Sequence, residues 1–151
     1  CEEQRKTEEL NVFADELRQV KKEILLLSDN GKLTINDVDL MTGEEFENFL
    51  VELFKRMGYS AWKTQTSNDQ GVDIVAAKNN YKIGIQAKCY SGTVSNKSVQ
   101  EIVAGIKHYK LDRAMVITNN YFTNSAVQLA VSNDVVLWDR EILKEKIKEF
   151  F

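Results

Sequence analysis

Residues 71–89 read GVDIVAAKNNYKIGIQAKC, and this stretch decides how the middle of the chain folds. Two apolar segments flank Asn79-Asn80, and a two-residue turn of this composition between alternating apolar residues is a strong signal for a β-hairpin. The sequence therefore predicts antiparallel strands over Val72–Ala77 and Lys82–Cys89, with Lys78 opposite Tyr81.

A loop longer than two residues would shift this pairing, but the apolar alternation of the two segments supports it independently. The register determines which side chains share a face of the hairpin. It places Asp73 across from Gln86, and Lys88, two residues further on, points the same way. The other face is predicted to be a continuous apolar layer, made of Val72, Ile74, Ala76, Ile83, Ile85 and Ala87.

The polar face of the hairpin has the chemistry of a hydrolytic metal site. Cβ atoms of opposed residues lie about 4.5–5.5 Å apart, so the oxygens of Asp73 and Gln86 can share one hard divalent cation. The ammonium of Lys88 can orient or deprotonate a water molecule and neutralise charge that develops on a phosphate.

Periodicity predicts the remaining elements of the chain body. Thr42 and Glu45 form a capping box, and the apolar spacing from Phe46 to Met57 is that of a helix with one buried face. The expected order after Met41 is α, β, β, β, α, β, α, β, α, which implies a mixed sheet with helices on both faces. Its other segments are expected at Tyr59–Thr64, Asn96–Tyr109, Arg113–Thr118, Thr123–Ser132, Val135–Trp138 and a closing helix to Phe151.

The first forty residues have a different pattern. Between Thr7 and Ser28 apolar residues recur every three or four positions, which predicts an amphipathic helix with a coiled-coil seam. The helix either packs on its own domain or pairs with a second copy to form a homodimer. Residues 1–40 are expected to be this helix and a linker over Ser28–Leu40, and residues 41–151 the catalytic domain. The seam consists of Leu10, Phe13, Leu17, Val20, Ile24 and Leu27.

Composition places the chain among soluble globular proteins. It has 151 residues, of which 43% are hydrophobic and 28% charged, and it has no run of about 18 apolar residues and no signal-peptide pattern. The two cysteines have neither zinc spacing nor disulfide density, which favours the cytoplasm. A first residue that is Cys and not Met predicts a fragment or a processed form.

The net charge of −3 is distributed unevenly. Residues 1–40 contain six Lys or Arg against ten Asp or Glu, and residues 41–151 contain fourteen against thirteen. A nearly neutral body neither proves nor excludes binding to DNA, because a few lysines beside a carboxylate site can meet phosphates.

Three short motifs together resemble the PD-(D/E)xK nuclease superfamily, and more narrowly the Mrr-like restriction endonucleases of type IV restriction. They are Phe46-Glu47, Gly71-Val72-Asp73 and Gln86-Ala87-Lys88-Cys89-Tyr90. The likeness runs from about Met41 to Lys146 and includes Met57-Gly58-Tyr59, Val116-Ile117-Thr118 and Tyr121-Phe122-Thr123.

The resemblance implies a restriction-endonuclease-like α/β fold, DNA as substrate, and Mg²⁺-dependent hydrolysis with Mn²⁺ as a substitute. It assigns catalysis to Glu47, Asp73, Gln86 and Lys88, and metal binding to Asp73, Gln86, the Ala87 carbonyl and Glu47. It also implies products with 5′-phosphates. Gln86 stands where the superfamily usually has a second acid, although Gln at this place is typical of Mrr-like members, and a neutral amide is the weaker ligand.

Several residues have a plain structural alternative. Glu44, Glu45 and Glu52 compete with Glu47 on spacing alone. Asp73 could stabilise a turn, Lys88 could be an edge-strand charge, and Asp69 is either a supporting acid or a loop residue. Tyr90 could stack on a base or a sugar, but an aromatic residue at a strand end more often packs; the residues expected in the core include Cys89, Trp62 and Trp138.

Two other functions remain open on the sequence. One is a structure-selective nuclease such as a junction-resolving enzyme, which preference for branched DNA would distinguish. The other is a DNA-binding or protein-interaction module whose site no longer cuts, for which Gln86 leaves room.

Overall fold

The computed structural model describes residues 2–28, 31–64 and 71–151, and within the first helix it describes side chains from Glu2 to Val20. Five strands and six helices are assigned in these ranges. The strands are β1 (Ser60–Lys63), β2 (Ile74–Lys78), β3 (Tyr81–Lys88), β4 (Arg113–Thr118) and β5 (Val135–Trp138). The helices are α1 (Glu2–Ser28), α2 (Ile35–Asp39), α3 (Gly43–Arg56), α4 (Asn96–Tyr109), α5 (Asn124–Ser132) and α6 (Arg140–Phe150).

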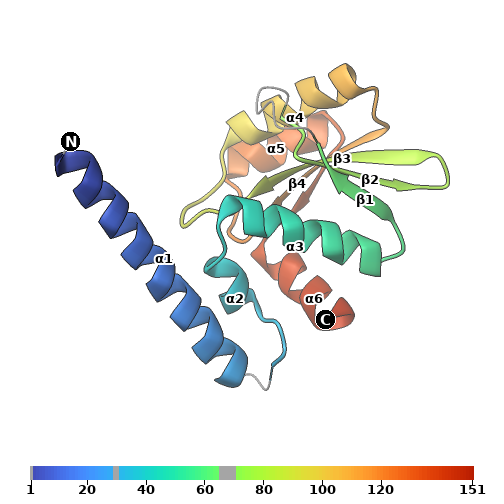
Figure 1. The fold of residues 1–151 in the computed structure, drawn as a ribbon. Helices are drawn as coiled ribbons and strands as arrows, with labels where there is room; N and C mark the ends of the chain where they lie inside the picture. The colour runs from blue at the N-terminus through green and yellow to red at the C-terminus, as the bar shows by residue number, and fades with distance from the viewer. Residues whose placement is uncertain (1, 29–30, 65–70) are drawn as a thin grey trace.

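The strands form one mixed sheet in the order β1-β2-β3-β4-β5. The first three are antiparallel neighbours, and β4 and β5 are added in parallel through α4 and α5. The expected fold class is confirmed: a mixed sheet, helices on both faces and an N-terminal helix (Figure 1).

The β2–β3 hairpin has the predicted register, with Lys78 opposite Tyr81 and Ile74 opposite Ile85. Asn79 and Asn80 take φ values of 52° and 67°, which are the left-handed conformations that a type I′ turn requires and that Asn tolerates. The turn chemistry therefore determines which residues of the two strands oppose each other.

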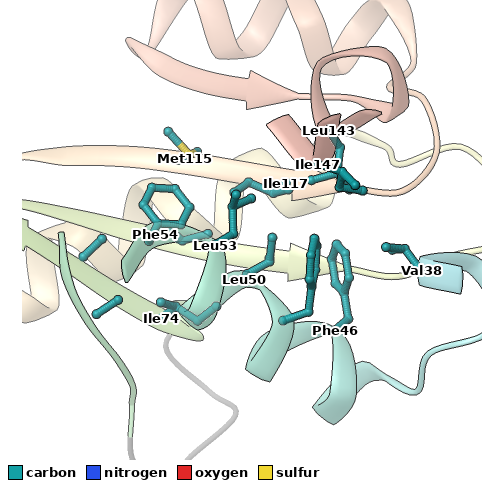
Figure 2. Close-up of a cluster of buried hydrophobic side chains, with 14 of the residues drawn as sticks. Val38, Phe46, Leu50, Leu53, Phe54, Ile74, Met115, Ile117, Leu143 and Ile147 are labelled. Carbon is teal, nitrogen blue, oxygen red and sulfur yellow. The ribbon is translucent and has the colours of Figure 1, made fainter. Parts of the chain in front are cut away.

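Two cores lie on opposite sides of the sheet. On one side α3 and α6 cover it, and side chains from β2, β4 and these helices fill the space, as Figure 2 shows for Phe46, Leu50, Ile74, Ile117 and Leu143. On the other side α4 and α5 bury Val99, Ile102 and Ala126 against Val75 and Val116. Burial of each large side chain contributes about 1.5–3 kcal/mol, so this double layer holds the strand ends in place.

Helix α3 begins where the sequence predicts. The Thr42 hydroxyl accepts from the Glu45 N–H at 3.1 Å, and the Glu45 carboxylate accepts from the Thr42 N–H at 3.0 Å. This capping box sets the rotation of the helix, and Phe46, Leu50 and Leu53 are then buried.

Helix α1 stands away from the body in Figure 1, and Leu10, Phe13, Leu17 and Val20 are exposed along it. The alternative in which this face packs on its own domain is therefore wrong for these four residues. The remaining seam residues, Ile24 and Leu27, lie outside the described side chains. No helix in the described ranges is long and apolar enough to span a membrane.

Three sequence expectations need correction. The linker contains a helix, α2, because Ile35 and Val38 are buried against the α3–α6 core. Val72 packs on the α4–α5 side and not with Ile74, because Asp73 leaves the strand ladder and breaks the alternation. Trp62, expected in the core, is 45% exposed on the edge strand β1.

Candidate active site

Asp73 is held against β3 by two hydrogen bonds at the point where β2 begins. Its backbone N–H donates to the Ile85 carbonyl at 2.8 Å, and its Oδ2 accepts from the Ala87 N–H at 2.8 Å. Because one side-chain oxygen is engaged by β3, the carboxylate has a defined direction at the hairpin.

Gln86 is buried to 3% exposure, and its Nε2 donates to the Glu101 Oε2 at 2.9 Å. Its Oε1 has no hydrogen-bond partner within the described ranges. A buried acceptor without a partner is costly, and such groups commonly belong to sites that bind something. The amide is therefore oriented by α4 with its oxygen left available.

Glu101 is a site residue that sequence reasoning missed. Its neighbour Gln100 is exposed. The available signal was the buried stripe of α4: Glu101 lies directly before Ile102 and one turn after Ser98, both buried. A carboxylate on the border of a buried stripe can reach the sheet beneath it.

Lys88 ends β3 and is half-buried beside Asp73. Burial raises the pKa of Asp73, and the charge of Lys88 partly offsets that rise; the Lys88 Nζ lies 5.5 Å from the centroid of the Tyr90 ring. Within the described ranges no carboxylate lies within ion-pair distance of Lys88, so its ammonium is available to an external anion.

The two candidate acids have perturbed ionisation. Burial, followed by the charge of Asp73, raises the pKa of Glu47 above its ordinary value, although Lys63 opposes the shift. Burial also raises the pKa of Asp73, and the Ala87 N–H and Lys88 only partly offset it. Two desolvated acids that repel each other are stabilised in their charged forms by a cation between them.

Among the competing glutamates of α3, Glu47 is the one beside Asp73. Glu44 is exposed and 3.9 Å from Lys63, Glu45 caps the helix, and Glu52 pairs with Arg56 at 3.2 Å. Each of the three alternatives thus has a structural role away from the hairpin.

The residues present fit a divalent cation through mixed oxygen donors. No group of three or more His, Cys, Asp or Glu side chains arranged to hold a metal occurs in the described part of the chain. A cation at this place would have to use Asp73, the free Gln86 oxygen and neutral or backbone oxygens, which Mg²⁺ and Mn²⁺ accept. Asp69, the other acid considered from the sequence, lies outside the described residues.

Cys89 has no nucleophilic character. Burial, with smaller effects of Asp39 and Glu45, raises the pKa of its thiol to about 11. Its Sγ lies 3.6 Å from the carbonyl oxygens of Val38 and Met41, so it packs as a small core residue, as expected.

The fold and the site together define a class: an α/β domain of the restriction-endonuclease type. Comparison with protein families makes this specific. The chain belongs to the restriction endonuclease family of the Mrr catalytic domain, which it matches over residues 38–147. No match was found among curated protein sequences.

Solved structures share the fold. The DNA modification-dependent restriction endonuclease AspBHI aligns with a TM-score of 0.56 and 19% identity over 70% of this chain and 30% of that one. The protein of unknown function AF1548 aligns with a TM-score of 0.55 and 16% identity over 66% of this chain and 63% of that one. The chain thus spans less than two-thirds of either protein, and at these identities the likeness concerns the fold.

Proposed function

We propose that this chain is an endonuclease that hydrolyses DNA phosphodiester bonds with Mg²⁺, for which Mn²⁺ can substitute. The observation that carries the proposal is that one hairpin presents a half-buried acid, Asp73, an amide oxygen of Gln86 and the ammonium of Lys88, the last two without partners among the described residues. Membership of the restriction endonuclease family supports it.

The cation would be held by Asp73, Gln86, the Ala87 carbonyl and Glu47. When bound, a divalent ion supplies charge stabilisation at the phosphate and makes water a stronger nucleophile. The rest of the chemistry rests on how this chain positions its own groups.

Lys88 meets the scissile phosphate. Its ammonium neutralises charge that develops on the phosphate oxygens and orients the attacking water, and its half-buried position strengthens both effects relative to bulk water. The water attacks phosphorus and gives up a proton, the bond between phosphorus and the 3′-oxygen breaks, and the leaving 3′-oxygen takes up a proton, so the products carry a 5′-phosphate and a 3′-hydroxyl.

Two groups act by positioning others. The Ala87 N–H holds the Asp73 carboxylate, and Glu101 holds the Gln86 amide so that its oxygen faces away from α4. Glu47 adds a second desolvated acid, whose raised pKa allows it to exchange protons nearer neutral pH than an exposed glutamate would.

A plasmid-nicking assay tests the proposal. Supercoiled DNA should be converted to nicked and linear forms with Mg²⁺ or Mn²⁺ and should stay intact in EDTA. A Lys88→Ala preparation, checked for native circular dichroism, controls for contaminating nuclease. Intact plasmid with every ion tested would reject the proposal.

One observation favours a second candidate, a DNA-binding module that does not cut. The described residues contain no cluster of three acids, and Gln86 replaces a charged ligand. Metal-independent DNA binding without nicking would select this module, and cleavage of branched but not linear DNA would select a junction nuclease.

The first forty residues are assigned a separate role. We propose that residues 41–151 are the catalytic domain. We also propose that α1 joins two copies of the chain into a homodimer, because its exposed leucine and phenylalanine residues have the spacing of a coiled-coil seam. A cytoplasmic location stays a prediction.

A further inference from the structure

A hollow of about 500 Å³ lies next to the proposed active site, at the carboxyl ends of three parallel strands. Residues that follow β3, β4 and β5 line it, together with α2. They include Tyr90 after β3, Asn119, Asn120 and Tyr121 after β4, Arg140 after β5, and Asp39.

The hollow is adjacent to Lys88. Lys88 and Thr118 are the last paired residues of β3 and β4, and the lining begins one or two residues beyond them. The Lys88 Nζ lies 5.5 Å from the Tyr90 ring centroid. A DNA strand whose phosphate meets Lys88 therefore brings a neighbouring nucleotide to the hollow. Ligand crevices of open α/β sheets lie at this edge.

The floor of the hollow is polar and electrically balanced. Two nitrogens of the Arg140 guanidinium donate to the two carboxylate oxygens of Asp39 at 2.7 and 2.9 Å, so each charge neutralises the other. Asn119, 4% exposed, donates to Asp39 and accepts from the Tyr90 N–H. A neutral floor favours an uncharged ligand over a phosphate.

The two tyrosines are exposed, and the loops that carry them are tied together. Tyr90 is 48% and Tyr121 is 42% exposed. The Tyr121 hydroxyl donates to Glu141 at 2.7 Å, and hydrogen bonds of Val94 with Tyr121 and Thr123 tie the two loops together. Aromatic rings beside a lysine that can meet a phosphate are a common platform for a nucleobase, which they bind by stacking.

We propose that this hollow takes an unpaired nucleobase of the strand being cut, stacked on Tyr90 and Tyr121. The inference rests on the proposed nuclease function and names its preferred substrate: DNA that is single-stranded or easily unpaired at the cut. A base in a stable duplex has to leave its stack first, which costs a few kcal/mol. Stacking tolerates every base, so no sequence preference follows.

Binding without cleavage tests this. In EDTA, an oligonucleotide that carries 2-aminopurine reports stacking by loss of fluorescence. The unmodified chain should quench the probe in single strands and at mismatches more than in a matched duplex. Absence of quenching in the unmodified chain overturns the proposal without reference to any variant.

Variants locate the platform. Tyr90→Ala and Tyr121→Ala should each weaken single-strand affinity by about 5- to 150-fold, which is the contribution of one stacked base, while Tyr90→Phe should retain it. Tyr81→Ala is the matched control: Tyr81 is 44% exposed at the other end of β3. Equal affinity of the unmodified chain and both alanine variants overturns the proposal.

The outcome is separate from that of the nuclease proposal. A chain that nicks plasmid but shows no tyrosine-dependent binding keeps the nuclease function and loses the base site. A chain that never nicks but quenches the probe through these tyrosines loses the nuclease function and keeps a base-binding site.

Discussion

Replacement of Gly71 by alanine should destabilise the fold through two measurable effects. Gly71 has φ of +74°, and a Cβ there would touch the carbonyl oxygen of Glu101 and lie 2.7 Å from its carbonyl carbon. A left-handed conformation costs a residue with a Cβ about 1–2 kcal/mol, and overpacking against backbone costs about 1–3 kcal/mol. The free energy of unfolding should fall by about 2–5 kcal/mol.

Two other glycines separate the two effects. Gly31 has φ of +77° but no described residue within 4 Å of its Cβ position, so Gly31→Ala should show the conformational cost alone. Gly92 has open space and no positive φ, so Gly92→Ala should be neutral within about 0.5 kcal/mol.

Urea denaturation followed by tryptophan fluorescence measures all three variants against the parent chain. The expected order of destabilisation is Gly71→Ala, then Gly31→Ala, then Gly92→Ala. Equal stability of the Gly71 and Gly92 variants would refute the close approach of the hairpin to α4. Glu101 also holds the Gln86 amide, so a displacement of Glu101 in the Gly71 variant should also weaken metal affinity.

Three further predictions concern the site and the chain ends. Asp73→Ala, checked for folding, should abolish Mg²⁺ and Mn²⁺ binding in calorimetry, and undiminished binding by the variant would place the metal elsewhere. Metal binding to the parent chain should weaken as pH falls, because burial raises the pKa of both Asp73 and Glu47 and protons then compete with the metal. Lys88→Ala should abolish cleavage but leave DNA affinity within a few-fold in a gel-shift titration, since one phosphate contact adds little to a whole interface, and full activity would exclude Lys88. In sedimentation experiments, the chain of residues 1–151 should be dimeric and the chain of residues 41–151 monomeric. If both chains sediment as monomers, the proposal that α1 mediates dimerisation is rejected.

A last prediction concerns specificity. Cleavage ends sequenced from a randomised DNA pool should show little consensus, because contacts to backbone and stacked bases carry no sequence information. A sharp consensus would mean that a loop such as Ser91–Asn96 reads base edges.

Local chemistry determined the parts of this protein that could be inferred from its sequence. The Asn79-Asn80 turn accounts for the hairpin register, and the Thr42 and Glu45 capping box accounts for the start of α3. Both depend on dihedral preferences and hydrogen bonds among residues a few positions apart, which a sequence displays directly. Alternation and helical spacing likewise indicated the order of elements and the mixed sheet.

Only the tertiary structure decided which residues far apart in the sequence come into contact. Glu101 meets Gln86 from fifteen residues away, and Glu47, not its neighbours, comes beside Asp73. The exposed tyrosines line one hollow because two parallel strands end at the same edge of the sheet. These outcomes depend on how helices rotate and pack over a sheet, an energy shared among many distant contacts, and no local pattern in the sequence encodes that sum.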